Sequence, residues 1–338
     1  MLSTESGDFH RLTDLSEAIL SVLNQPVTLD GVSVTVTASI GVAVATDDST
    51  AIELLRQVDI ALREAKRSRA RVVQFSPSQQ RSSLERLTLA ARLEIAIQNG
   101  EVRLWLQKKV DARTGRTIGA EALARWLHPE FGLLTPGDFL DLIEISDLHE
   151  QFADIVLTEG VRLLAECRAV DPDFILSINM TPRAICSPGF PRRVAKQLTE
   201  AGLDTSALTI EITEREIDDL DAVVAQCRNL TSLGVTISID DFGMGWSSFD
   251  RLRKLPVGEI KIDQSFVRSI LLDRKDLLIA QSIVDLASSL DIDCVAEGIE
   301  EAAHADVLID LGCRTLQGYH FGTPQPSAMF VGELGSTD

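Results

Sequence analysis

The feature that most constrains this chain is a series of short apolar segments that each stop at a polar residue. From residue 100 onward, eight such segments alternate with helical patterns. From the third onward they recur roughly every 20 to 35 residues, which fits repeated strand–helix units and a closed eight-stranded barrel. The predicted strands cover residues 104–107, 117–125, 174–179, 209–213, 236–240, 259–263, 293–296 and 315–318.

The connection between the first two predicted strands is too short for a parallel crossover. Gln107 and Glu121 are separated by a short polar stretch with a turn at Thr114 and Gly115. We therefore predict that the first strand runs antiparallel to the second. The longer gap before the third strand has room for two helices. The predicted fold class is α/β, a (β/α)₈ TIM-like barrel with an antiparallel first strand.

A smaller, partial α/β segment precedes the barrel. Pro77 begins a polar stretch, and a helical pattern over 83–99 ends at Gly100. In the first segment we predict a strand over 32–45, a helix over 51–69 and a strand over 72–75. The expected organisation is this segment over residues 1–80, a connecting helix over 81–100 and the barrel over 101–338.

Polar residues end most of the predicted strands, and in a barrel these ends meet on one face. One acid at a strand end is most often solvated or a helix cap, but recurrence across one barrel indicates a functional site. Carboxylates and an amide, without clustered histidines or thiolates, favour Mg²⁺ or Mn²⁺ over zinc. The candidates are Gln107, Glu121, Asn179, Glu211, Asp240, Asp241, Lys261, Asp263, Glu297 and Gln317.

Asp240 and Asp241 are the most demanding of these candidates, because they are adjacent at the end of a buried strand. Like charges about 4 Å apart repel by roughly 4 kcal/mol at an effective dielectric constant near 20. A bound divalent cation is the simplest remedy. Lys261 alternates with Ile260 and Ile262, so we expect it to point into the barrel mouth. There it is either an internal counter-ion or a group that places the attacking water.

The charge of the chain limits what it can bind. Fifty-one acids against 32 bases give a formal charge of −19, which opposes nonspecific attraction to DNA, RNA or an anionic membrane. A phosphate-bearing substrate would therefore need bound metal and a few placed basic residues. The sequence shows no long apolar run and no secretory signal pattern, so we expect a cytoplasmic protein without a membrane segment. The five dispersed cysteines are expected to be reduced thiols.

Seven motifs follow one another in the barrel region. The first, GAEALARWLHPEFGLLTPGDF, contains Glu121, Ala122 and Leu123. The others are SINMTP (177–182), TIEITE (209–214), IDDFGMGWSSF (239–249), EIKIDQSF (259–266), VAEGIE (295–300) and LQGYHFGTP (316–324). From Leu84 to Phe330 the chain thereby resembles the EAL domain of bacterial cyclic di-GMP phosphodiesterases.

This resemblance implies an activity and a set of ligands. The implied reaction is hydrolysis of cyclic di-GMP to linear pGpG with two Mg²⁺ or Mn²⁺ ions. One metal would be held by Glu121, Asn179, Glu211 and Asp240, and the second by Asp240, Asp241 and Glu297. Lys261 would assist the attacking water.

The resemblance also implies residues around these ligands. Gln107, Arg125 and Gln317 match positions that contact the substrate or water. Glu214, Asp263 and Glu300 match positions that support the ligands without binding the metals directly. A homodimer is a further implication.

Two stretches of the first segment resemble the trailing half of a GGDEF domain. They are TASIGVAVA (37–45) and LLRQVDIALREAKRSRARVVQF (54–75). The SGDF stretch over 6–9 matches the GGDEF turn only in part, so we expect no cyclase activity. The segment is either a truncation or a natural remnant that serves packing and dimerisation.

Two other classes of function stay open from the sequence. One is a receptor that binds cyclic di-GMP without hydrolysing it, and the other is a structural interaction module. Receptors of this family commonly lose ligand acids, whereas every implied ligand position is filled here. Lys108 replaces the usual proline, and Met244 and Trp246 replace the commoner threonine and tyrosine. These three departures lie beside ligands and do not replace them.

Overall fold

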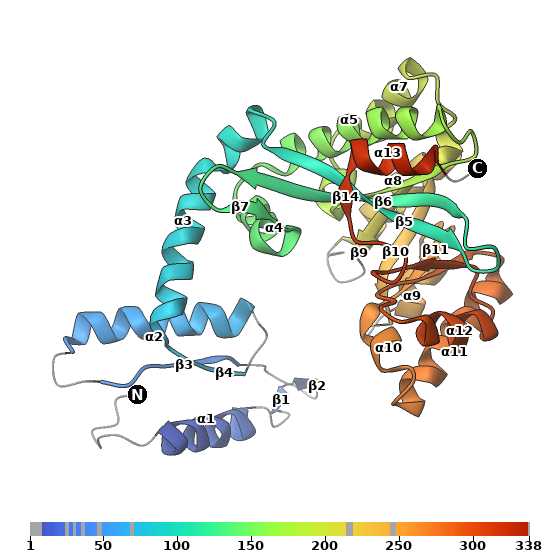
Figure 1. Ribbon diagram of the computed structural model, residues 1–338. Coiled ribbons are helices and arrows are strands. Elements are labelled where there is room, and N and C mark those ends of the chain that lie inside the picture. The colour runs from blue at the N-terminus through green and yellow to red at the C-terminus, as the bar shows by residue number, and fades with distance from the viewer. Residues whose placement is uncertain are drawn as a thin grey trace. The chain divides into compact units, whose positions relative to one another are not determined.

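A computed structural model describes residues 9–23, 27–29, 32–34, 38–45, 49–67, 71–213, 219–243 and 248–336 (Figure 1). The chain divides into two compact units, Met1–Arg92 and Leu93–Asp338. Each unit is described by itself. The division falls inside one long helix, α3 (Pro77–Gln98).

The first unit contains a hairpin and a βαβ unit. β1 pairs antiparallel with β2, and β3 pairs parallel with β4 through the crossover helix α2. A Cβ on Gly41 would lie 2.4 Å from the backbone nitrogen of Leu62, so α2 and β3 pack backbone against backbone there. The elements are α1 (Phe9–Leu23), β1 (Val27–Leu29), β2 (Val32–Val34), β3 (Ile40–Val42), α2 (Ala51–Arg67) and β4 (Val72–Gln74).

The predicted single strand over residues 32–45 is wrong. β2 and β3 belong to different sheets, and residues 35–37 between them lie outside the described residues. Ala38 and Ser39, which precede β3, are part of neither strand, and alanine is depleted in strands. The connecting helix also begins earlier than predicted. Pro77 is its first residue, a position where the missing N–H of proline costs nothing.

The second unit is built on a closed barrel of eight strands, as predicted. β5 is antiparallel to both of its barrel neighbours, β6 and β13, and all other neighbouring barrel strands are parallel. Two short strands, β7 (Gly132–Leu134) and β14 (Gln325–Pro326), extend the sheet. The barrel strands are β5 (Val102–Asp111), β6 (Thr117–His128), β8 (Ile175–Asn179), β9 (Leu208–Thr213), β10 (Thr236–Phe242), β11 (Glu259–Ile262), β12 (Asp293–Ala296) and β13 (Thr315–Gln317).

Helices connect the parallel strands and surround the barrel (Figure 1). The long gap before β8 holds two main helices, α4 (Pro136–Ile145) and α5 (His149–Arg168), as predicted. The remaining helices are α6 (Pro182–Ile185), α7 (Phe190–Glu200), η1 (Thr205–Ala207), α8 (Leu220–Ser232), α9 (Ser248–Lys254), α10 (Gln264–Ser269), α11 (Arg274–Leu290), α12 (Ala302–Asp310) and α13 (Ser327–Leu334). Among the helices of the described residues, none is long and apolar enough to span a membrane.

The strands alternate between an apolar outer face and a polar inner face. On β9, Leu208, Ile210 and Ile212 join the hydrophobic core beneath the helices. Glu211 between them has the opposite side-chain direction and is nevertheless 0% exposed. The apolar core therefore lies between the barrel and the helices, while polar side chains fill part of the barrel itself. Five of these buried polar residues are Ser177, Thr209, Glu211, Ser238 and Lys261.

Candidate active site

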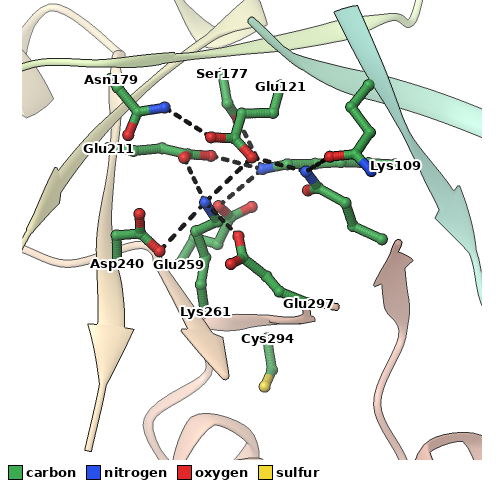
Figure 2. Close-up of polar contacts among 12 residues, drawn as sticks. Lys109, Glu121, Ser177, Asn179, Glu211, Asp240, Glu259, Lys261, Cys294 and Glu297 are labelled. Atoms are coloured by element: carbon green, nitrogen blue, oxygen red, sulfur yellow. Dashed lines mark hydrogen bonds and ion pairs between the residues drawn. The ribbon is translucent and has the colours of Figure 1, made fainter. Parts of the chain in front are cut away.

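Lys261 lies at the centre of a cluster of carboxylates inside the barrel (Figure 2). Its side chain on β11 is 1% exposed, and its Nζ lies 2.5 Å from Glu211 Oε2. Asp240 Oδ1 is 3.3 Å away and Glu121 Oε2 is 3.4 Å away. Glu297, which follows β12, also pairs with this ammonium. The structure thus brings together acids from four strands or strand ends, as the recurrence of polar ends predicts.

Amide side chains fix the carboxylate of Glu121 from two sides. Asn179 Nδ2 donates to Glu121 Oε1 at 2.6 Å, and Gln317 Nε2 donates to Glu121 Oε2 at 2.7 Å. Gln317 Nε2 also lies 3.1 Å from Gln107 Oε1, and Gln107 Nε2 donates to the carbonyl of Gly322 at 3.2 Å. This chain of contacts joins β13, β5, β6 and β8, so Glu121 is oriented by its neighbours.

The acids of this cluster differ in how easily they hold a proton. Burial alone would raise the pKa of Glu211, but the nearby ammonium groups of Lys109 and Lys261 outweigh it and lower the pKa to about 2. Burial and neighbouring acids raise the pKa of Glu121 and of Glu297. Burial opposes the charge of Lys261, yet the surrounding carboxylates raise its pKa. Glu211 therefore stays negatively charged at neutral pH.

The end of β10 carries the adjacent acids Asp240 and Asp241 in an irregular backbone. Asp241 has a positive φ of 53°, and its N–H donates to Asp240 Oδ1 at 2.9 Å. The pairing of β10 with β11 shifts register between Ile239 and Phe242, at this same point. Burial, Asp240 and a hydrogen bond with Asp263 raise the pKa of Asp241 to about 7. The bulge therefore turns two consecutive carboxylates toward the site region.

A glycine sets the chain direction directly after Glu297. Gly298 has φ +69°, and a Cβ there would lie 2.4 Å from the Cβ of Gln264. A side chain at this position would meet both a strained backbone and a steric clash. The turn that places Glu297 beside Lys261 thus depends on Gly298.

Two predicted residues, Arg125 and Glu300, lie apart from the central cluster. The Arg125 guanidinium is 5.9 Å from the centre of the Trp105 ring and donates to the carbonyl of Ala124 at 2.8 Å. Glu300 is 45% exposed in its side chain and pairs with Arg268 at 2.9 Å. Glu214 lies outside the described residues, as do Met244 and Trp246.

Asp263 contacts the site through Asp241, as described above, and also begins the following helix. It is the N-cap of α10, where its carboxylate accepts from the N–H of Ser265 at 2.9 Å. Asp263 thereby links the β10 acids to the start of α10.

The sequence prediction missed a second buried lysine and two of its partners. Lys109, Ser177 and Glu259 lie two residues from Gln107, Asn179 and Lys261, respectively, on the same strand faces. Lys109 Nζ contacts Ser177 Oγ at 2.7 Å, Glu211 Oε1 at 2.9 Å and Glu259 Oε1 at 3.3 Å (Figure 2). Extending the period-two pattern from each candidate would have found all three.

A cavity of about 300 Å³ opens beside the cluster. Polar and apolar residues line it together, and the apolar ones include Leu123, Pro136, Leu140 and Met180. The polar residues are Glu121, Asn179, Asp240 and Asp241, with Thr181 and Thr213. A larger cavity of about 850 Å³ beside α13 is lined by Lys108, Arg116 and Phe330, among others, and by none of the predicted site residues. We place the site at the smaller cavity, because the acids converge there.

The donor groups of the cluster fit a hard divalent cation. Carboxylates and the amide of Asn179 provide oxygen ligands, the type that Mg²⁺ and Mn²⁺ prefer. Within the described part of the chain, no three His, Cys, Asp or Glu side chains already form a coordinating group. The ammonium of Lys261 lies between the acids and balances part of their charge.

Comparison with known families agrees with this geometry. The profile described as "EAL domain" matches residues 90–324. The chain belongs to the EAL domain family. The profile described as "Diguanylate cyclase, GGDEF domain" matches residues 1–71, so the EAL domain is preceded by part of a GGDEF domain, as the sequence motifs predict.

Relatives of this EAL protein include signalling proteins of Pseudomonas aeruginosa. The bifunctional diguanylate cyclase/cyclic di-GMP phosphodiesterase MucR of Pseudomonas aeruginosa is 35% identical over 95% of this chain and 47% of its own length. The cyclic di-GMP phosphodiesterase NbdA of the same organism is 32% identical over 94% of this chain and 41% of its own length. The chain thus spans about half the length of the curated relatives it matches.

Solved EAL structures share the fold. The MucR phosphodiesterase in complex with c-di-GMP has a TM-score of 0.68 and 37% identity, covering 72% of this chain and 99% of that one. The EAL enzyme Bd1971, bound to cAMP and cyclic di-GMP, has a TM-score of 0.72 and 31% identity, covering 85% of this chain and 77% of that one. These likenesses confirm the predicted TIM-barrel fold.

Proposed function

We propose that this EAL domain hydrolyses cyclic di-GMP to linear pGpG with two Mg²⁺ or Mn²⁺ ions. The observation that carries the proposal is the convergence of the implied ligand acids on one end of the barrel around Lys261. A phosphodiesterase of this family, MucR, has been solved in complex with c-di-GMP. Receptors of this family that bind cyclic di-GMP without hydrolysing it commonly lose ligand acids, whereas this chain has all of them.

The ligand set follows the sequence expectation. Glu121, Asn179, Glu211 and Asp240 would hold one metal, and Asp240, Asp241 and Glu297 the other. When bound, the two ions supply charge neutralisation of the phosphodiester and a water of lowered pKa.

The residues of the chain itself would bind, orient and balance charge. The ammonium of Lys261, held among Glu211, Asp240 and Glu297, would orient the attacking water and balance the carboxylates. The amide relay from Gln107 through Gln317 would keep Glu121 aligned.

The substrate would lie in the 300 Å³ cavity beside these groups. Arg125 would contact a substrate phosphate, because a guanidinium donates to phosphate oxygens without competing for the metals. Gln107 and Gln317 would make further polar contacts with the substrate or water. Asp263, Glu300 and Glu214 would support the ligands. We also propose that the protein acts as a homodimer, which light scattering of the purified chain would test.

The test is incubation of the purified chain with cyclic di-GMP and Mg²⁺ or Mn²⁺, followed by chromatographic separation of pGpG. We expect pGpG with metal and none with chelator. Glu121→Gln should reduce turnover by at least about 100-fold, since even groups that only support ligands typically cost 10- to 100-fold. Glu200→Gln, at an exposed side chain of α7, is the matched control and should turn over as the wild type does.

Binding of cyclic di-GMP without any pGpG, under either metal, would instead support the receptor function. If the chain neither binds nor hydrolyses cyclic di-GMP, only a structural role is left for the barrel.

A further inference from the structure

A second buried lysine, Lys109, lies one layer deeper in the barrel than the proposed metal ligands. It follows Gln107 by two residues on β5 and is 5% exposed. The three protons of its ammonium have three acceptors within 3.3 Å, namely Ser177 Oγ, Glu211 Oε1 and Glu259 Oε1. Because all three donors are satisfied, the position of this ammonium is fixed by β8, β9 and β11 together.

Within the described residues, Glu211 is the only proposed metal ligand among the hydrogen-bond acceptors of Lys109, and it divides its two oxygens between two lysines. Oε1 accepts from Lys109 at 2.9 Å, and Oε2 lies 2.5 Å from Lys261 (Figure 2). Lys261 itself is shared with Glu121, Asp240 and Glu297. Lys109 therefore fixes the rotation of the Glu211 carboxylate, with Oε1 directed away from the other acids and Oε2 toward them.

Glu259 provides a second carboxylate that pairs with Lys109, at 3.3 Å. It lies two residues before Lys261 on β11, and its side chain is 13% exposed. Two carboxylates thus hold one ammonium in a nearly dry environment, where an unpaired lysine would be costly. The arrangement lies two residues along each strand from Gln107 and Lys261.

We propose that Lys109 is a positioning residue that holds Glu211 in the orientation needed to bind metal. The inference rests on the proposed function for the assignment of Glu211 as a metal ligand. Lys109 touches neither metal nor substrate in this proposal, and acts only through Glu211.

The sign of its effect on metal affinity separates this role from simple charge balance. A positive charge near a cation site weakens cation binding, so a lysine that only balances charge would, on removal, leave a tighter metal site. A lysine that orients a ligand would, on removal, leave a weaker one.

The experiment is calorimetric titration of Mn²⁺ into the full chain, stripped with chelator and free of substrate. Lys109→Met should raise the Kd for Mn²⁺ by roughly 10- to 100-fold, the usual cost of losing a group that orients a ligand. Lys196→Met, at an exposed side chain of α7, removes an equal charge and should leave the Kd unchanged. An unchanged or lower Kd for Lys109→Met would overturn the proposal.

A double variant covers the case in which Lys109→Met fails to fold. Lys109→Met with Glu259→Gln removes one of the two acids left unpaired, so its melting temperature should exceed that of the single variant. Its Kd for Mn²⁺ should stay raised. The double variant removes one positive and one negative charge. A Kd equal to that of the wild type would therefore show that Lys109 affects metal affinity only through charge balance, and would overturn the proposal.

Failure of the proposed function gives a different pattern. A wild-type chain that binds Mn²⁺ but forms no pGpG contradicts the phosphodiesterase activity and leaves the Lys109 titration decisive. A wild-type chain that binds no Mn²⁺ contradicts both proposals.

Discussion

Replacing Lys261 with methionine removes the cation that four buried carboxylates share. These carboxylates lie within 3.4 Å of its Nζ. At an effective dielectric constant near 20, one contact at about 3.3 Å corresponds to roughly 5 kcal/mol of Coulomb attraction. Much of this is offset by desolvation and by repulsion among the acids. Removing one partner from a buried ionic cluster typically costs about 3 to 5 kcal/mol, and we expect a loss of that size.

The assay is thermal unfolding of Lys261→Met and wild type in chelator and then in excess Mn²⁺. A loss of about 3 to 5 kcal/mol corresponds to roughly 6 to 20 °C in a barrel of this size. Mn²⁺ should raise the melting temperature of the variant more than that of the wild type, because a divalent cation can replace the missing charge. Turnover should nevertheless fall by roughly 10²- to 10⁴-fold, the usual contribution of a group that handles the attacking water.

Lys196→Met is the control for the loss of one lysine, and it should change stability by less than about 0.5 kcal/mol. If Lys261→Met melts within about 2 °C of the wild type in chelator, Lys261 does not balance the cluster and the electrostatic reasoning is refuted.

Three further predictions concern the edges of the site. In chelator, native Asp241 keeps a proton up to its raised pKa of about 7, whereas the unfolded chain releases it near 3.8. Its contribution to stability therefore falls as pH rises through this window, so the stability of Asp241→Asn relative to wild type should increase from pH 4 to 7 in urea unfolding; a flat difference would contradict this. Gly298→Ala and Gly115→Ala share φ +69°, but a Cβ would meet another side chain only at Gly298. Thermal unfolding should show about 1 kcal/mol lost at Gly115 and about 1 to 3 kcal/mol more at Gly298, and equal losses would exclude the clash. Glu300→Gln breaks an exposed pair with Arg268 and should change the free energy of unfolding by less than about 1 kcal/mol. A turnover loss above about tenfold in that variant would support the role of Glu300 beside the ligands.

The barrel could be predicted because its signal is repeated along the chain. The polar ends of β8, β10 and β12 each interrupt an apolar run, and parallel strands in a barrel direct such ends to one face. The reversed first strand followed from the short connection before Glu121. Both inferences depend only on residues close together in the sequence, and closure of the barrel then brings the separate strand ends to one site.

Lys109 was missed in the sequence because of where the first strand was predicted to end. The predicted first strand stopped at Gln107, because two lysines there interrupt the apolar pattern, while the observed β5 continues to Asp111. The period-two pattern extended from Gln107 places Lys109 on the same face, but only the closed barrel shows that it meets Glu259 on β11.

The ion pair of Glu300 could not be predicted from the sequence either. Its partner Arg268 comes from α10, and no pattern in the sequence relates the two. Pairs of this kind depend on how separate helices and loops pack, so they require the folded chain.

The reversed direction of β5 also determines where the preceding chain joins the barrel. Val102, the first residue of β5, pairs with Trp126 near the carboxyl end of β6, on the side of the barrel where the parallel strands end. In a barrel with only parallel strands, the chain would enter at the opposite side, far from the reacting groups. Here the polypeptide leaving α3 enters at the rim of the site and continues directly into the strand that bears Gln107 and Lys109. A change in the chain just before Val102 is therefore made beside the reacting groups, whereas a change at the β5–β6 turn around Gly115 is made at the distant end of the barrel.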